Sequence, residues 1–324
     1  MPRPSGPRLP CRDMSQHVTD RFGLIHASSE FHSTGSYRSL WADVQRGRLV
    51  KLRRGIYAEA PHWSELDPRE RHMLRIRAAA ASASSPIAVA GYSAAALWGM
   101  PIRGDWPDEV TLIDRWRGGG RSAGDVRRTA RDFGSAQLYE VDGIRCTGIA
   151  RTALDLARVE PLPGAVATMD WCLSRSNPIA ITKDDLWHEL GRLNQWAPRR
   201  RLEGTIHLAT HLSGSFGESE ARVVIFQLGY ADPVLQQEFV DEEGTMFADF
   251  TWPRVRVVGE FDGKVKYTRE EYTKGDPGEV VWREKRRQDR FGRIGYSMFR
   301  VITPDVKDPR RLDAILRSSG VPRA

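Results

Sequence analysis

A group of acidic residues and a lysine near the C-terminal end of the chain has the composition of a metal-dependent hydrolytic site. The group consists of Asp249, Glu260, Asp262 and Lys264. Clustered carboxylates repel one another unless a cation lies between them, and hard oxygen ligands suit Mg²⁺ or Mn²⁺. A bound divalent ion could polarise a phosphodiester and lower the pKa of an attacking water, while Lys264 could orient that water or stabilise charge on the phosphate. All four residues are therefore candidate catalytic residues, with Asp249, Glu260 and Asp262 as candidate metal ligands.

A β-hairpin has to bring these residues together. Residues 246–252 and 254–262 flank Pro253, a pattern that is typical of two antiparallel strands. With the turn centred just after Pro253, Asp249 lies opposite Glu260. Side chains of a strand alternate between its two faces, so the residues two and four positions after Glu260 share its face. The register predicts that three carboxylates and an ammonium group converge on one side of a sheet.

A fifth acidic residue, Glu218, has two interpretations. A helix of about three turns is expected between Ser215 and Gly229, with Glu218 in its first turn. Glu218 is a candidate catalytic residue, but its position three residues after Ser215 is also the spacing of a helix capping box. Asp262 is ambiguous in the same way, because it either joins the metal site or forms a turn with Gly263. The sequence leaves both alternatives open.

The segments MFADFTWPRVRVVGEFDGKVKY and RRQDRFGRIGYSMFRVITPDV resemble the PD-(D/E)xK nuclease superfamily, in particular the branch near the very-short-patch-repair endonucleases. The resemblance covers about residues 214–306 and implies a restriction-endonuclease-like α/β fold. It places Glu218 on the helical acid of that branch. It places three residues on metal-ligand positions: Asp249, Glu260 and Asp262. The chain departs from the pattern at Ala248, where a proline is usual, at Asp262, where a lysine is expected, and at Lys266, where a histidine often occurs.

The N-terminal part of the chain predicts a winged helix-turn-helix. A short helix is expected to open at residues 24–25, and a second helix at residues 37–46, ended by Gly47. Residues 49–58 then read as a basic hairpin, the wing. The apolar residues of the second helix, Leu40, Trp41 and Val44, are expected to form one stripe that packs inward.

Docking of the second helix in a major groove makes several polar residues candidate contacts with double-stranded DNA. These candidates are Tyr37, Arg38, Gln45, Arg48, Lys51, Arg53 and Arg54. The segment GRLVKLRRGIYAEA resembles the winged helix of the AbiEi family of type IV antitoxins, and VAGYSAAALWGMPI and VDGIRCTGIARTALDLAR resemble the middle domain that follows it. The resemblance implies repression of the protein's own operon and a possible cognate toxin as partner.

A second basic cluster lies near the C-terminus. Between residues 283 and 300 there are seven cations and two anions, and a helix expected at residues 282–293 presents Arg286, Arg287 and Arg290 on one face. These arginines either bind phosphates or form an ordinary solvated surface. The whole chain carries 49 Lys and Arg against 42 Asp and Glu, a net charge of +7 that is compatible with a nucleic-acid partner.

The composition narrows the class of protein. With 40% hydrophobic residues in 324, the chain can form cores, so global disorder is excluded. No stretch approaches the ~18 apolar residues of a membrane span, and the Pro/Arg-rich N-terminus lacks the apolar segment of a signal peptide. Three widely spaced cysteines indicate neither a disulfide framework nor a zinc site. We expect a cytoplasmic protein that does not interact with membranes.

These observations predict an α/β multidomain protein. The expected parts are a flexible tail (1–20), a winged helix-turn-helix (21–62), an AbiEi-like α/β middle domain (63–200) and an endonuclease-like α/β domain (201–324). Arg199–Arg201, which follow Pro198, are expected to form a linker. The predicted function is DNA binding with Mg²⁺- or Mn²⁺-dependent nicking of DNA. The alternative is a non-catalytic transcriptional repressor or antitoxin that keeps a nuclease fold for binding only.

Overall fold

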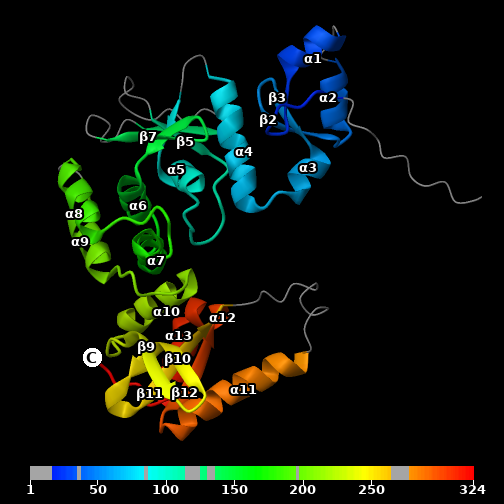
Figure 1. The fold of residues 1–324 in the computed structure, drawn as a ribbon. Helices are drawn as coiled ribbons and strands as arrows, with labels where there is room; N and C mark the ends of the chain where they lie inside the picture. Colours follow the sequence, from blue (N-terminus) through cyan, green and yellow to red (C-terminus); the bar gives the residue numbers. More distant parts are fainter. Residues whose placement is uncertain are drawn as a thin grey trace, which may run out of the picture. The chain divides into compact units, whose positions relative to one another are not determined.

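The structure, a computed structural model, divides into two compact units (Figure 1). It describes residues 17–34, 38–83, 87–113, 125–129, 136–194, 197–263 and 277–324. The first unit takes in the described residues of 1–87, 106–110 and 121–127, and the second unit takes in the other described residues. The protein is therefore of mixed α/β type, with three sheets in its described part.

The first unit is a small three-stranded antiparallel sheet with helices. Its elements are β1 (Leu24–His26), α1 (Ala27–Thr34), α2 (Arg38–Gln45), β2 (Leu49–Arg53), β3 (Ile56–Glu59), α3 (Ala60–Glu65) and α4 (Pro68–Ala81). The strand order is β1-β3-β2. Gly47 (φ +70°) follows α2, and Gly55 (φ +77°) lies in the turn between β2 and β3, two left-handed positions that favour glycine. The predicted second helix, its ending at Gly47 and the basic hairpin are confirmed.

Two expectations for the first unit are wrong. Residues 24–25 belong to strand β1 instead of opening a helix, because Leu24 pairs with Ala58 of β3 and is buried with it. Trp41 does not pack inward: 69% of it is exposed, whereas Leu40 is buried. The reason is helical geometry, since Trp41 lies about 100° around the helix from Leu40 and on the side away from the core.

The second unit begins with most of a five-stranded sheet, whose residues 110 and 126–127 are counted with the first unit, and with a group of helices. The strands β4 (Ala88–Val89), β5 (Val110–Ile113), β6 (Val126–Thr129), β7 (Leu138–Val141) and β8 (Ile144–Thr147) have the order β6-β5-β4-β8-β7. The helices are α5 (Gly91–Trp98), α6 (Ile149–Ala157), α7 (Leu162–Leu173), α8 (Lys183–Arg192) and α9 (Arg199–Leu208). The linker expected at Arg199–Arg201 is wrong, because these residues start α9. Leu202 and Ile206 are buried one turn apart, and their packing fixes α9.

The C-terminal part of the second unit carries the candidate site. Its elements are α10 (Phe216–Gln227), β9 (Val234–Asp241), β10 (Gly244–Trp252), a 3₁₀ turn (Pro253–Val255), β11 (Val257–Asp262), α11 (Pro277–Arg293), β12 (Ser297–Ile302), α12 (Thr303–Lys307) and α13 (Pro309–Ser318). The strand order is β12-β11-β10-β9. Strands β9, β10 and β11 are antiparallel to their neighbours in chain order, and β12 runs parallel to β11.

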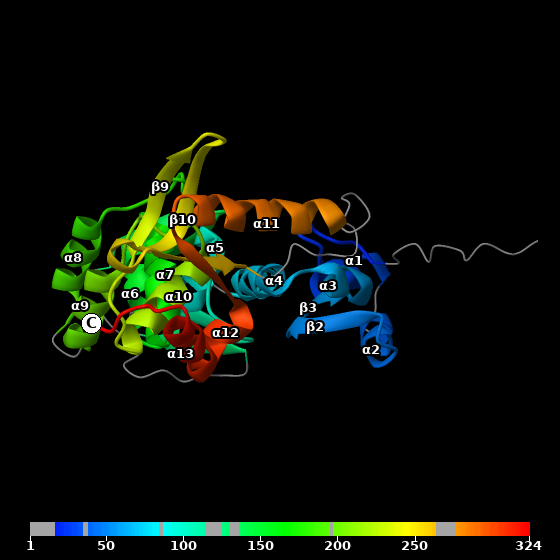
Figure 2. The same ribbon diagram turned by 90° about the horizontal axis from the view of Figure 1, so that it is seen from below.

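Helices cover both faces of this sheet (Figure 2). Val257 belongs to a core that includes residues of α10, α12 and α13, and its neighbour Val258 belongs to a core that includes Phe291 of α11. Consecutive residues of a strand point to opposite faces, so α11 lies on one face and the other three helices lie on the opposite face. Within the described residues, no helix is long and apolar enough to cross a membrane.

Candidate active site

Asp249 lies beside two other predicted acidic residues, Glu218 and Glu260, and each of the three belongs to a different element. Phe250 of β10 pairs with Gly259 of β11, so the next residues along the two strands, Asp249 and Glu260, lie opposite each other as predicted. The backbone N–H of Phe261 donates a 2.9 Å hydrogen bond to Asp249 Oδ2. Glu218 approaches from the first turn of α10. The hairpin register is therefore confirmed.

Gln236 joins two of these carboxylates and was not predicted. Its side-chain Nε2 donates hydrogen bonds to Glu218 Oε2 at 3.0 Å and to Asp249 Oδ1 at 3.1 Å. Gln236 lies in strand β9 with φ at +49°, a left-handed conformation that is uncommon for a residue other than glycine. Such strain persists where the surroundings enforce it, often at functional sites. Nothing in the sequence marks Gln236, because its role depends on the pairing of β9 with β10.

Glu218 takes part in the cap of its helix and is also joined, through Gln236, to Asp249. Its Oε2 accepts a 2.8 Å hydrogen bond from the N–H of Gly214, just before the helix, and its own N–H donates to Ser215 Oγ at 3.2 Å. These contacts cap α10 much as a capping box does. The same Oε2 accepts the hydrogen bond from Gln236. The helix cap thus fixes the carboxylate beside Asp249.

The electrostatics of the site disfavour its ionised form. Burial raises the pKa of Glu218, and the nearby negative charge of Asp249 raises it further. Burial also raises the pKa of Asp249, against the lowering effect of the hydrogen bond from Phe261. For Glu260, burial raises the pKa, Arg287 opposes this, and Asp249 adds to it. A cation placed among these oxygens would relieve the repulsion and favour the ionised carboxylates.

Arg287 of α11 supplies positive charge to one of the three carboxylates. Its Nε donates a 2.5 Å hydrogen bond to Glu260 Oε1, and its Nη2 donates to the carbonyl of Phe247. The other two predicted phosphate contacts of this helix also have acidic partners. Arg286 pairs with Glu243, and Arg290 pairs with Asp241. All three arginines that were predicted to contact phosphates are therefore engaged with carboxylates of the sheet or of the β9–β10 turn.

The observed acidic cluster differs in one member from the predicted metal-ligand set. Asp262 is exposed at the end of β11, and in the described part of the chain no hydrogen bond or ion pair joins it to another side chain. Lys264 lies outside the described residues. No group of three or more His, Cys, Asp or Glu within the described ranges is already arranged around a common metal position. The residues that could hold a divalent ion are thus Glu218, Asp249 and Glu260, after Arg287 has released Glu260.

Comparisons with known proteins give relatives without an assigned function. No family model matches the chain. Two curated proteins of Mycobacterium tuberculosis, "Uncharacterized protein MT2308" of strain CDC 1551 and "Uncharacterized protein Rv2248" of strain H37Rv, are each 29% identical to the chain over 282 residues. The match covers 86% of this chain and 94% of each relative. The similarity therefore extends through both units, and their function has to be argued from the residues.

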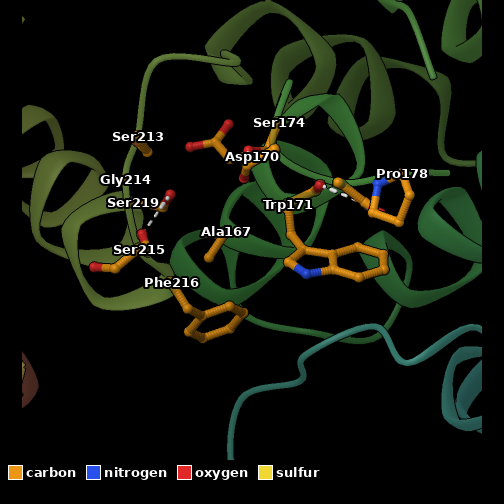
Figure 3. Close-up of a pocket in the computed structure, with 12 residues that line it drawn as sticks. Ala167, Asp170, Trp171, Ser174, Pro178, Ser213, Gly214, Ser215, Phe216 and Ser219 are labelled. Carbon is orange, nitrogen blue, oxygen red and sulfur yellow. Dashed lines mark hydrogen bonds between the residues drawn. The ribbon is translucent and has the colours of Figure 1, made fainter. Parts of the chain in front are cut away.

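A cavity of about 250 Å³ lies next to the cap of α10, between that helix and α7 (Figure 3). Ser213, Gly214 and Ser215 line it on the side of α10. On the side of α7 lies Asp170, which is 2% exposed. Asp170 accepts hydrogen bonds from the N–H of Thr210 and from Arg222. The ion pair between Asp170 and Arg222 connects α7 to α10. Together with the bond from Thr210, it holds the loop in which the N–H of Gly214 donates to Glu218.

The predicted DNA contacts of the first unit fall into an exposed set and an ion-paired set. Arg38, Gln45, Lys51 and Arg54 are exposed on α2 and on the wing formed by β2 and β3. Arg48 donates to the buried carboxylate of Asp43, and Arg53 lies 3.4 Å from Asp125. Tyr37 lies outside the described residues. The structure thus leaves two exposed positive charges on the wing, Lys51 in β2 and Arg54 in the turn that follows it.

Proposed function

We propose that the protein binds double-stranded DNA through its first unit and cuts one DNA strand with a divalent metal ion held in the C-terminal sheet. The observation that carries the proposal is the position of Asp249 beside both Glu218 and Glu260, with the three carboxylates on three different elements. Placing one buried and two partly buried carboxylates near one another without a ligand opposes folding, because each carboxylate prefers to be ionised in water. A divalent metal site is a direct chemical reason for such a group.

The order of elements supports the proposal. The branch near the very-short-patch-repair endonucleases combines a helical glutamate, an Asp-Phe strand, a Glu-x-Asp-Gly strand and a Gly-aromatic…Arg strand. Here the helical glutamate is Glu218, and the three strands are β10 with Asp249, β11 with Glu260 and β12 with Arg300. For the first unit, the strand order β1-β3-β2 around α1 and α2 supports a winged helix-turn-helix.

The donor chemistry of the cluster fits Mg²⁺ or Mn²⁺. Asp249 and Glu260 lie on adjacent strands, and Glu218 of α10 lies beside Asp249, so hard oxygen atoms from three elements surround the position of Asp249. Such an ion, when bound, acts as a Lewis acid on a phosphodiester and activates a water molecule. Arg287 would leave Glu260 and supply a cation close to a bound phosphate. Gln236 would keep Glu218 and Asp249 at a fixed separation.

A plasmid-nicking assay with Mg²⁺ or Mn²⁺ tests the nuclease. We expect the wild-type chain to relax supercoiled plasmid and both Asp249→Ala and Glu260→Ala to lose this activity. Glu238→Ala is the matched control, because Glu238 is an exposed carboxylate on the same sheet and should be dispensable. Loss of cutting in the control as well, or cutting that persists in Asp249→Ala, would contradict the proposed site.

The second candidate function is a transcriptional repressor or antitoxin without nuclease activity. The ion pair between Arg287 and Glu260 favours it, since a permanent arginine at this carboxylate would take the place of a metal ion. This function predicts DNA binding without cutting under either metal, and repression of a reporter placed behind the gene's own promoter. A nucleotidyltransferase-like toxin encoded next to the gene would support it further.

A further inference from the structure

The exposed tryptophan of α2 is the one large side chain of this helix that neither the core nor the proposed nuclease site explains. Trp41 is 69% exposed, although the helix buries Leu40 next to it. At 100° per residue, Arg38, Trp41 and Gln45 lie within about 60° of one another around the helix, and Leu40 and Asp43 lie on the opposite side. One outward face of α2 thus carries a cation, an indole and an amide.

Ionic contacts on the inner side fix this orientation of α2. Asp43 is 5% exposed, and its carboxylate accepts hydrogen bonds from Arg48 at 2.9 Å and contacts His17 Nε2 at 2.8 Å. Rotation of the helix that buried Trp41 would remove the carboxylate from both partners and leave it in an apolar setting. Trp41 therefore stays outward in the free protein and is available to a partner.

The charge around Trp41 indicates the chemistry of that partner. Arg46 and Arg48, at the end of α2, have side chains that are 65% and 48% exposed, and Lys51 and Arg54 are exposed on the wing. The acidic residue of α2 within its described part, Asp43, is buried and neutralised by its partners. An apolar protein surface would have to desolvate these cations, whereas a polyanion is attracted by them.

We propose that Trp41 packs against the 5-methyl group of a thymine in the major groove of duplex DNA. In a duplex the faces of the bases are stacked and hidden, and the thymine methyl is the apolar group on the major-groove edge of the base pairs. Arg38 and Gln45 lie beside the indole on the same face and have the donors that suit guanine and adenine edges. Trp41 is therefore a specificity residue, and this role rests on the proposed DNA binding.

The test uses the full-length protein and duplexes selected from a random-sequence pool. In the best-retained duplex, each thymine is replaced in turn by deoxyuridine, which removes only the 5-methyl group, and affinities are measured by fluorescence anisotropy at constant salt. We expect one replacement to weaken wild-type binding about fourfold, the effect of one buried methyl group. Trp41→Ala should bind the unmodified duplex about fourfold more weakly than wild type. Its affinity should not fall further when the same thymine is replaced by deoxyuridine. Phe226→Ala, which truncates another exposed aromatic residue, should behave as wild type.

Each alternative outcome has a defined meaning. Wild-type affinity that no thymine replacement changes, or a pool that is retained without any sequence preference, overturns the thymine contact but leaves DNA binding intact. An equal loss for Trp41→Ala on thymine and uracil duplexes also overturns it, because Trp41 would then act on another group. A change in the sedimentation coefficient of Trp41→Ala in the absence of DNA would assign the indole to contacts between copies. If no duplex is retained at all, the proposed DNA binding fails, and the thymine contact fails with it.

Discussion

At the scale of single residues, the candidate site is held together by one amide. Gln236 donates from a single nitrogen to Glu218 and to Asp249. Its amide group therefore lies between two carboxylates that would otherwise repel each other directly. Its left-handed backbone costs on the order of 1 kcal/mol, which the two charge-assisted hydrogen bonds offset. The arrangement keeps the acidic oxygens close together, at the expense of stability when they are ionised.

The burial of Glu218 beside the negative charge of Asp249 predicts how the stability of the protein depends on pH. The pKa of Glu218 is raised in the folded protein, so in the pH range above its unfolded pKa of about 4.3 the folded state binds more protons than the unfolded state. Stability is therefore lost as the pH rises through the raised pKa. We expect Glu218→Gln, whose amide oxygen can still accept from Gly214 and Gln236, to be more stable than wild type at pH 8 by about 1 kcal/mol. The advantage should vanish near pH 4 in thermal unfolding experiments.

The control for this prediction is Glu238→Gln, which neutralises an exposed carboxylate of strand β9. Exposed carboxylates contribute little to the pH dependence of stability, so its unfolding temperature should follow wild type across the range. A lower stability of Glu218→Gln at pH 8 would mean that the carboxylate is stabilised in its ionised form. The acidic cluster would then be a structural network instead of a strained functional one.

At the scale of elements, the position of β11 depends on a glycine in α10. A Cβ atom built on Gly217 would lie 2.1 Å from a ring carbon of Phe261, the residue between Glu260 and Asp262. The helix can approach the strand this closely because residue 217 has no side chain. The distance between Glu218 and the carboxylates of the sheet therefore depends on this contact.

Substitution of this glycine gives a test of the packing. Gly217→Ala should destabilise the protein by about 1–3 kcal/mol, because the phenyl ring or the helix has to move. Gly204→Ala is the matched control in helix α9, where nothing lies within 4 Å of the new Cβ, and it should stabilise by about 0.5–1 kcal/mol through helix propensity. Denaturant unfolding of both variants checks the pair, and equal effects of the two substitutions would contradict the close contact.

The sequence predicts those parts of the fold that local rules determine. The hairpin register that pairs Asp249 with Glu260 follows from the alternation of side chains about the turn at Pro253, and Gly47 ends its helix as expected. The linker expected at Arg199–Arg201 is wrong because Pro198, taken as a break, precedes the first turn of a helix, a place where proline is well tolerated.

Interactions between distant elements could not be read from the sequence. Arg287 meets Glu260 across 27 positions of the chain, and Gln236 meets Glu218 across 18. Both pairs form only after α10 and α11 have packed on opposite faces of the sheet. The exposure of Trp41 was missed for a related reason: the buried Asp43, paired with Arg48, lies on the side of Leu40 away from Trp41, so the inward face of α2 lies between Leu40 and Asp43 and not between Leu40 and Trp41.

At the scale of the whole molecule, the two basic clusters that look alike in sequence differ in their available charge. In α11, Arg286, Arg290 and Arg293 form ion pairs with Asp241 or Glu243 of the β9–β10 hairpin. On the wing of the first unit, Lys51 and Arg54 are exposed. A phosphate backbone would have to displace carboxylates from the arginines of α11, whereas no residue that the structure describes forms an ion pair with Lys51 or Arg54. DNA affinity should therefore depend mainly on Lys51 and Arg54, that is, on the wing of the first unit.

The salt dependence of binding distinguishes the two clusters. Each phosphate neutralised by a lysine or arginine contributes about 0.9 to the slope of log K against log salt concentration. The double variant Lys51→Ala/Arg54→Ala should thus bind duplexes of any sequence more weakly and with a slope smaller by about 2. The matched double variant Arg286→Ala/Arg293→Ala also removes two cations, but both already have Glu243 as a partner, so its slope should stay close to that of wild type. If the second pair lowers the slope as much as the first, phosphates displace the carboxylates of the hairpin, and the DNA path then runs over α11, past Arg287 and the acidic cluster.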